Sequence, residues 1–368
     1  MVLRQKCSTD GAAPVVGKGL NAADCIYSAL NDGRTRKLFR RLRFHLWSIF
    51  LFTYTDLKTI VGPSSLFGLM NAFALSIYSS SSRNPPAADF SLPPPTQILA
   101  QTPTLIFWVW LNLLPFAIDN QRQPDAIIED ALNEPWRTLP TGRLSPQAAK
   151  YLMLSSYSLA IILSIWLGNW PQCLALIVLG VWYNDLRGGD SSCLVRNLIN
   201  AWGYTCFSSG AMQVAIGGRD GPSALRLLGW WYAVLACVIF STVHAQDMYD
   251  QRGDAVKNRK TVPLVIGDVK ARWTIAVMMV FWSVMAPLCW KTPLIGYAVC
   301  LWLGLLVARR TLKYRDEKAD KKTFRIWNAW IAAIYFLPLL QAMQSGGSAA
   351  PPMEAVIYWG PLRHLSIL

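Results

Sequence analysis

The sequence predicts an all-α integral membrane protein with nine transmembrane helices, and three observations support this prediction. Hydrophobic residues make up 53% of the 368 residues and charged residues only 15%, whereas soluble domains average about 25% charged residues. Nine stretches are apolar enough to cross a bilayer, which takes about 20 residues. Basic residues between these stretches gather on alternate sides. The apolar content excludes a disordered chain, and so sparse a charged surface predicts no nucleic-acid partner.

Each expected helix corresponds to one apolar stretch. The first stretch, 44–77, is expected to break near residues 55–59, where two charged residues interrupt it. The gaps near residues 168–170 and 290–292 are very short, so the helices that they join should be antiparallel neighbours. The other expected spans lie near 97–118, 147–167, 169–183, 195–217, 224–246, 271–289, 293–308 and 326–343.

The distribution of basic residues predicts the topology. Of the 35 Lys and Arg, 29 lie in the N-terminal segment and in the loops after the second, fourth, sixth and eighth spans, whereas the opposite loops hold four. Cytosolic loops are enriched in Lys and Arg, so we expect a cytosolic N-terminus and a C-terminus across the membrane, which we expect to be the endoplasmic reticulum. The expected organisation is a basic segment (1–43), a membrane domain (44–343) and a tail (344–368).

The loop after the second span carries a first group of acidic residues. Asp125 and Glu129 are four residues apart and would share one face of a helix, and Asp130 is adjacent. Solvated loops commonly carry such charges, so this cluster alone does not define a site.

A second acidic group follows the sixth span. Asp247, Asp250 and Asp254 are spaced i, i+3 and i+7 and would lie on one helical face. Like charges this close repel one another, and bound cations would neutralise them. Carboxylate oxygens suit Mg²⁺, which binds through one or two carboxylates together with substrate phosphates.

The two clusters occupy corresponding positions, four spans apart, and both follow even-numbered spans. They should therefore open to the same, cytosolic side, which favours one shared site over two solvated loops. Acidic and basic groups beside a membrane cavity suit a ligand with an anionic head and an apolar tail, such as an isoprenyl diphosphate. The basic residues near the clusters are Arg122, Arg137, Arg143, Lys257, Arg259 and Lys260.

These motifs resemble those of the UbiA superfamily of intramembrane prenyltransferases. Residues 133–143, NEPWRTLPTGR, are similar to the NRPxRPLPxG stretch that follows the first motif of that family. The second motif appears as DQRGD at 250–254, followed by TVP at 261–263 and GD at 267–268. The resemblance covers nearly all of 44–343 and implies a UbiA-like bundle of nine helices around a central cavity.

The first motif departs from the usual NDxxDxxxD pattern. Asn120 is followed by Gln121, and ten residues separate Asn120 from Asp130 where the usual form has eight. This NQ…ED form resembles a fungal branch of the superfamily that includes membrane-bound sesquiterpene cyclases, the bergamotene cyclases among them. The departure leaves open which of Asp125 and Glu129 is a direct metal ligand.

The resemblance implies two Mg²⁺ ions that act together with the diphosphate of the substrate, with Asn120 orienting the first cluster. The implied ligands are Asp125, Glu129 and Asp130 for one ion, and Asp247, Asp250 and Asp254 for the other.

Other residues are candidates to bind the two ends of the substrate. Four basic residues could hold the diphosphate, although each could instead be an ordinary cytosolic-loop cation: Arg137, Arg143, Lys257 and Lys260. The resemblance adds Tyr183 and Asn197 near the diphosphate. Aromatic faces could stabilise an allylic cation or could simply pack helices, and these candidates are Trp47, Tyr54, Trp202, Tyr204 and Phe207. Asp56 and Lys58 are either functional groups within the membrane or a mutual ion pair.

Three functions are compatible with these features. The first is a terpene cyclase that converts farnesyl diphosphate to a cyclic sesquiterpene and diphosphate, which the variant first motif favours. The second is a prenyltransferase that passes the prenyl group to an aromatic or other acceptor, which the general motif pattern favours. The third is a transporter without enzymatic activity. The sequence leaves the oligomeric state, chain length and product open.

Overall fold

The computed structural model describes residues 33–81, 92–218 and 224–346. The chain forms two compact units, Met1–Ile49 and Phe50–Leu368. Most of the expected basic segment and nearly all of the expected tail lie outside the described residues. The described part of the first unit is the basic beginning of helix α2 (Gly33–Thr53).

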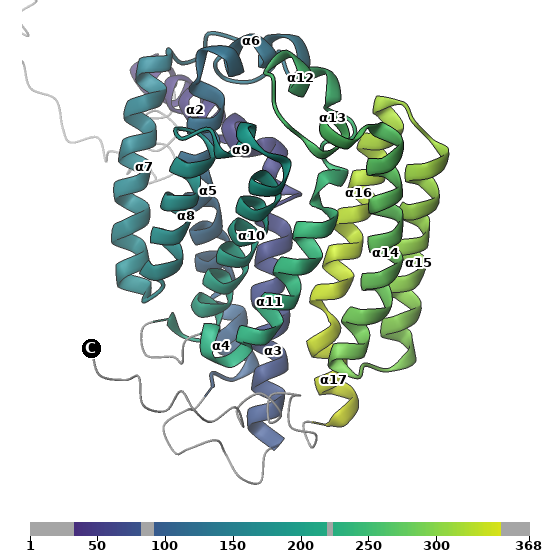
Figure 1. The fold of residues 1–368 in the computed structure, drawn as a ribbon. Helices are drawn as coiled ribbons and strands as arrows, with labels where there is room; N and C mark the ends of the chain where they lie inside the picture. The colour runs from purple at the N-terminus through teal and green to yellow at the C-terminus, as the bar shows by residue number, and fades with distance from the viewer. Residues whose placement is uncertain (1–32, 82–91, 219–223, 347–368) are drawn as a thin grey trace, which may run out of the picture. The chain divides into compact units, whose positions relative to one another are not determined.

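The second unit is built from helices, and its described residues contain no strand. Long helices run side by side along the unit, and short helices cap one end (Figure 1). The long helices are α3 (Val61–Ser81), α5 (Thr102–Arg122), α7 (Pro146–Leu167), α8 (Trp170–Tyr183), α10 (Cys193–Ala215), α11 (Ala224–Thr242), α14 (Asp268–Trp290), α15 (Leu294–Lys313) and α16 (Glu317–Tyr335). A shorter helix, α17 (Leu337–Ser345), follows α16.

The expected break in the first span is present. Helix α2 ends at Thr53, a 3₁₀ helix, η1, covers Tyr54–Leu57, and α3 begins at Val61. The charged and polar residues between the two helices line a cavity that is described below. The break therefore exposes backbone and polar side chains to an aqueous space within the bundle, where they need no lipid contact.

The expected count of nine spans is not confirmed. Seven helical segments among the described residues are long and apolar enough to cross a membrane: α3, α5, α7, α11, α14, α15, and α16 together with α17. Helix α8 is apolar but has only 14 residues. Helix α10 is long but more polar, because it packs against α3, α5, α8 and α11 and is buried along most of its length. Protein covers most of α10, so the covered part of its surface need not match lipid.

Small residues let α10 approach its neighbours closely. A Cβ atom on Gly68 of α3 would lie 2.9 Å from the Cβ of Ala211 on α10. A Cβ atom on Gly210 would overlap the indole ring of Trp108, whose Nε1 donates a hydrogen bond to Ser164 Oγ at 2.8 Å. Close packing through small residues is typical of membrane helices and holds α10 at the centre of the unit.

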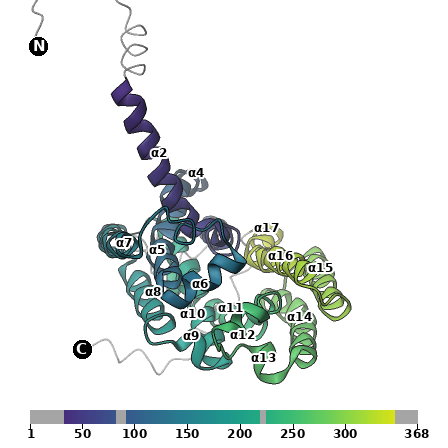
Figure 2. The same ribbon diagram turned by 90° about the horizontal axis from the view of Figure 1, so that it is seen from above.

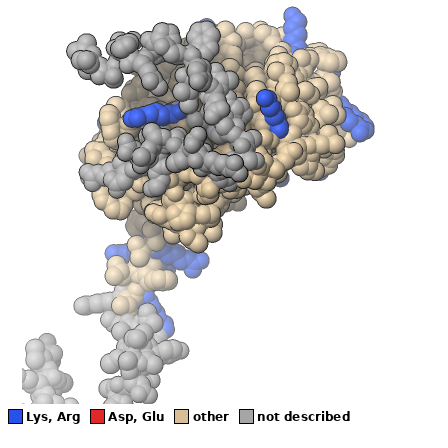
Figure 3. Space-filling model, turned by 90° about the horizontal axis from the view of Figure 1, so that it is seen from below, with Lys and Arg blue, Asp and Glu red and all other residues tan. Residues whose placement is uncertain are grey.

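The loops that carry the acidic clusters meet at one end of the bundle. Helix α6 (Pro124–Asn133) carries the first cluster, and α12 (Gln251–Val256) follows the start of the second. The two short helices pack against each other above the long ones, beside α9 (Gly188–Ser191) and α13 (Val262–Ile266) (Figures 1 and 2). The opposite end shows a few separate Lys and Arg side chains and no acidic side chain on the described surface that is in view (Figure 3).

Candidate active site

A cavity of about 650 Å³ lies where the two acidic loops meet. Glu129 and Asp130 reach it from the middle of α6, and Asp247 and Asp250 reach it from the chain between α11 and α12. Asp250 occupies the N-cap position of α12, but its side chain does not cap that helix. Its carboxylate is therefore available to the cavity.

Gly253 brings the two clusters together. A Cβ atom at this position would lie 2.8 Å from Glu129 Oε1, 2.9 Å from Asp250 Oδ1 and 2.7 Å from Asn133 Nδ2. One carboxylate from each cluster and one amide thus surround the same small volume, which is free only because residue 253 lacks a side chain. Gly253 lies inside the second motif, between Asp250 and Asp254. This position was the sequence signal that could have identified its role.

The clusters are also joined by ion pairs. Lys257, just beyond α12, pairs with Glu129 of α6. Other carboxylates pair with arginines, and the shortest distances between charged atoms are 2.7 Å for Asp130–Arg137, 3.0 Å for Asp247–Arg196 and 3.1 Å for Asp254–Arg259.

Three of these paired carboxylates keep one oxygen atom without a partner. Oδ2 of Asp130, Asp247 and Asp254 is buried and accepts no hydrogen bond from the described residues. Buried carboxylate oxygens without donors are costly. Asp130 and Asp247 line the polar cavity, so their unpartnered oxygens fit a cation site.

Burial raises the pKa values of three carboxylates in the two clusters. Burial, together with the charges of Asp254 and Glu129, raises the pKa of Asp250 to about 7. Burial also raises the pKa values of Asp130 and Asp254, in spite of their arginine partners. A bound cation would favour the ionised form of all three groups.

The donor set fits Mg²⁺ held jointly with a phosphate group. Within the described ranges, no three His, Cys, Asp or Glu residues are grouped so that they could hold a metal ion by themselves. Mg²⁺ is commonly bound through one or two carboxylates, with waters and substrate phosphates completing its octahedron. The convergence of Glu129 and Asp250 supplies such a pair of carboxylates.

The structure separates Asp125 from the rest of its cluster. Asp125 is exposed in the first turn of α6 and lines a polar side pocket of about 130 Å³. Asn120 lines both this pocket and the main cavity. Lys257 and Arg259 also face both spaces, so the side pocket adjoins the cavity.

The expected basic residues are divided by the fold. Arg137 and Lys257 line the main cavity, whereas Arg143 and Lys260 are not among its lining residues. Lys260 is exposed and donates its backbone N–H to the Asp190 carbonyl at 3.1 Å.

Two arginines that the sequence did not single out for the diphosphate, Arg196 and Arg259, line the cavity instead. Arg196 directly precedes Asn197, which donates to the Phe240 carbonyl at 3.0 Å and ties α10 to α11. The rotation of α10 about its own axis therefore decides which of these two neighbouring side chains faces the cavity. Arg196 is a lone arginine at the start of an otherwise uncharged helix, and this sequence signal could have identified it.

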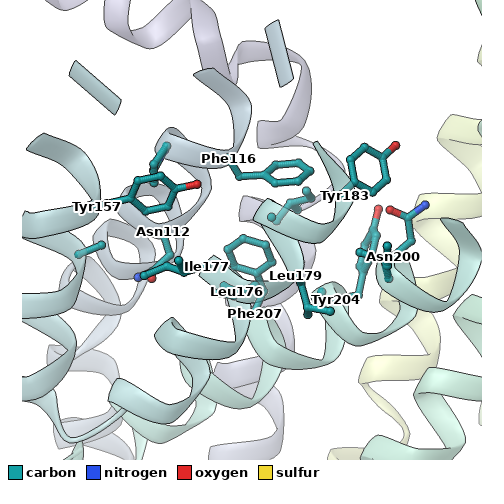
Figure 4. Close-up of a pocket in the computed structure, with 16 residues that line it drawn as sticks. Asn112, Phe116, Tyr157, Leu176, Ile177, Leu179, Tyr183, Asn200, Tyr204 and Phe207 are labelled. Carbon is teal, nitrogen blue, oxygen red and sulfur yellow. The ribbon is translucent and has the colours of Figure 1, made fainter. Parts of the chain in front are cut away.

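An apolar pocket adjoins the polar cavity (Figure 4). Its volume is about 60 Å³, and its walls come from α5, α7, α8 and α10. Phe207 and Tyr204, both expected in an apolar cavity, line it together with Phe116 and Tyr157. The residues that line both spaces are Ile60, Phe116, Tyr183, Asn200 and Tyr204.

The other aromatic candidates lie elsewhere. Tyr54 lines the polar cavity and contacts Trp136 edge to face, with 5.4 Å between ring centroids. Trp202 is 53% exposed and lines neither space. Trp47 belongs to the first compact unit.

The helical membrane bundle and this site define an integral membrane protein with a polar cavity that continues into an apolar pocket. The model of the UbiA prenyltransferase family matches residues 122–330, and the chain belongs to this family.

Two relatives and one solved structure illustrate the similarity. The chain is 30% identical over 240 residues to the fumagillin beta-trans-bergamotene synthase of Aspergillus fumigatus, covering 64% of this chain and 80% of the relative. It is 24% identical over 324 residues to a polyprenyl transferase of Hericium erinaceus, covering 84% and 99%. The structure of a digeranylgeranylglyceryl phosphate synthase superposes with a TM-score of 0.52 at 16% identity, covering 83% of this chain and 99% of that one.

Proposed function

We propose that the protein ionises an isoprenyl diphosphate inside the membrane and cyclises the resulting cation. The favoured substrate is farnesyl diphosphate, and the products would be a cyclic sesquiterpene and diphosphate. The observation that carries this proposal is the continuity of a charged cavity with an apolar pocket, since five residues line both. An amphiphilic diphosphate needs both environments at one place.

The charged residues would exchange partners when substrate binds. Lys257 and Arg137 now pair with Glu129 and Asp130. An incoming diphosphate would attract these cations, because arginine and lysine bind phosphate oxygens through charge-assisted hydrogen bonds. The freed carboxylates would be available to Mg²⁺, with Glu129 and Asp250 as its first ligands. When bound, Mg²⁺ supplies positive charge that offsets the charge developing on the leaving diphosphate.

The remaining residues of the two motifs have supporting roles in this proposal. Asp247 and Asp254 hold Arg196 and Arg259 at the cavity wall through ion pairs. Tyr183 accepts a hydrogen bond from Arg196 and lines the cavity, the side pocket and the apolar pocket. Its ring therefore stands at the boundary between the charged and apolar ends of the substrate.

The apolar pocket suits the prenyl cation. Phe116 and Phe207 present aromatic rings to it, and aromatic faces stabilise cations at short range. Its wall has few polar groups, and these include the hydroxyls of Tyr157 and Tyr204. A dry environment protects a carbocation from capture by water, so cyclisation can proceed before the charge is lost.

Similarity to a relative named as a bergamotene synthase supports cyclisation, and similarity to a polyprenyl transferase supports the second candidate, prenyl transfer to an acceptor. One structural feature favours transfer. The cavity extends to Lys321 and Arg325 of α16, beyond the acidic clusters. These cations could receive an acidic acceptor.

The basic loops support a cytosolic position for the cavity mouth, because cytosolic loops are enriched in Lys and Arg. We also propose the endoplasmic reticulum as the membrane, which stays a prediction. Protease protection of tagged termini in sealed vesicles would test this orientation.

The deciding experiment incubates membranes that contain the protein with farnesyl diphosphate and Mg²⁺ and without an acceptor. Release of diphosphate with a sesquiterpene hydrocarbon supports cyclisation. Turnover that begins only when an aromatic acceptor is added would replace cyclisation by transfer. No turnover of any prenyl diphosphate, with or without acceptor, would favour a transporter.

A further inference from the structure

A carboxylate at the helix break faces the cavity apart from both acidic clusters. Asp56 lies in η1, between α2 and α3, and lines the cavity together with Ile60. Ile60 also lines the apolar pocket, and its backbone N–H donates to the Asp56 carbonyl at 2.8 Å. Asp56 is therefore one helical turn from the junction between the charged cavity and the apolar pocket.

Asp56 is not neutralised by a basic residue. Thr59 Oγ1 donates to its Oδ1 at 3.5 Å, and within the described chain no Lys or Arg forms an ion pair with it, Lys58 included. Arg137 interacts with it electrostatically but is engaged with Asp130 at 2.7 Å. Asp56 thus lies outside both acidic clusters and outside their ion pairs.

We propose that the Asp56 carboxylate is the base that accepts the proton lost when the prenyl cation becomes product. This role rests on the proposed function. Heterolysis of the C–O bond leaves both electrons on diphosphate and a carbocation in the cavity. A C–H bond beside the cationic carbon, or the X–H bond of an acceptor, then breaks. The C–H electron pair forms the C=C bond; with an acceptor, a lone or π electron pair of the acceptor forms the C–X bond and the X–H pair stays on the acceptor. In both cases the proton binds an Asp56 oxygen.

The released diphosphate is the competing base in the same cavity. Position distinguishes the two, because diphosphate would lie among Lys257, Arg137 and the carboxylates of both clusters, whereas Ile60, one helical turn after Asp56, lines the apolar pocket that would hold the cation. Asp56 would also attract the positive charge toward that end of the cavity.

The test measures two products of the full-length membrane protein with farnesyl diphosphate and Mg²⁺: diphosphate, and hydrocarbon or acceptor adduct. In Asp56→Asn, diphosphate release should continue, while the terminal product formed per diphosphate should fall about 100-fold, the scale of general-base catalysis. Prenyl alcohol, formed when water captures the cation, should accumulate. Asp56→Glu, which keeps the carboxylate, should restore the product with a changed isomer ratio.

Asp316→Asn is the matched control. Asp316 caps the start of α16, where its Oδ1 accepts from Ala319 N at 2.9 Å, and asparagine caps helices equally well. It should leave the product ratio unchanged.

An unchanged product ratio in Asp56→Asn would overturn the proposal in favour of diphosphate as the base. An equal fall in diphosphate release and product would also overturn it, because Asp56 would then act in ionisation through Arg137. If the unsubstituted protein releases no diphosphate from any prenyl donor, the proposed function itself fails, and the role of Asp56 with it.

Discussion

Lys257 forms an ion pair with Glu129, so a cation that follows the second acidic motif neutralises a carboxylate of the first. The two residues are far apart in the chain and come from α6 and the end of α12, which pack against each other. The pair places the cation proposed to bind phosphate and the carboxylate proposed to bind the metal at one point of the cavity. It also keeps both charges compensated before substrate arrives.

Replacement of Lys257 tests the partner exchange. Lys257→Gln should lower kcat/KM for the prenyl diphosphate about 10- to 100-fold, because a hydrogen bond to a charged group contributes about 1.5–3 kcal/mol. Lys270→Gln, an exposed lysine at the start of α14, is the matched control and should leave kcat/KM unchanged. Equal kinetics of the two variants would argue against diphosphate binding by Lys257.

Filling the space beside Gly253 should abolish activity without unfolding the protein. A Cβ atom there would meet Glu129, Asp250 and Asn133 within 3.0 Å, and all three atoms are ends of side chains that can move aside. Displacing catalytic groups by about 1 Å can lower rates about 100-fold, so Gly253→Ala should lose diphosphate release to at least that extent.

Gly229→Ala is the control for this substitution, because a Cβ atom there meets nothing within 4 Å. Its activity should equal that of the unsubstituted protein. Both variants should retain the same apparent Tm in detergent. Full activity in Gly253→Ala would show that the glycine does not maintain the cation site.

The dependence of diphosphate release on Mg²⁺ should change when Asp250 is replaced. Chelation of divalent cations should stop diphosphate release, and Mg²⁺ should restore it. Asp250→Asn should raise the Mg²⁺ concentration for half-maximal release at least about tenfold, the effect of removing even a residue that only supports a metal ligand. A Mg²⁺ titration of diphosphate release measures this shift, and activity that persists in a chelator would contradict the site.

The packing of α10 makes a separate prediction about stability. Gly210→Ala should destabilise the protein by about 1–3 kcal/mol, the usual range for overpacking, because the new methyl group overlaps the Trp108 ring. Gly203→Ala lies on the same helix and meets nothing within 4 Å. It should be neutral or stabilising by up to about 1 kcal/mol. The apparent Tm, measured in the same detergent, should therefore fall for Gly210→Ala and stay the same or rise for Gly203→Ala.

Local sequence patterns predicted much of the fold because they reflect whether a segment contacts lipid or water. Apolar stretches located the long helices, and charged residues correctly located the break between α2 and α3. The count of nine spans is not confirmed, for a reason that local patterns do not contain. Helix α10 is surrounded by other helices, and a helix that protein rather than lipid surrounds can carry polar residues.

The sequence by itself determined the family and the approach of the two acidic motifs at one end of the bundle, and it predicted the chemistry of these motifs. Only the tertiary structure decided which members of each motif meet. It joined Glu129 to Asp250 at Gly253, moved Asp125 into the side pocket, and turned Arg196 rather than Asn197 toward the cavity. The physical reason is that a motif fixes the types and spacing of its residues, whereas their orientation depends on helix rotation and on packing between segments distant in the chain.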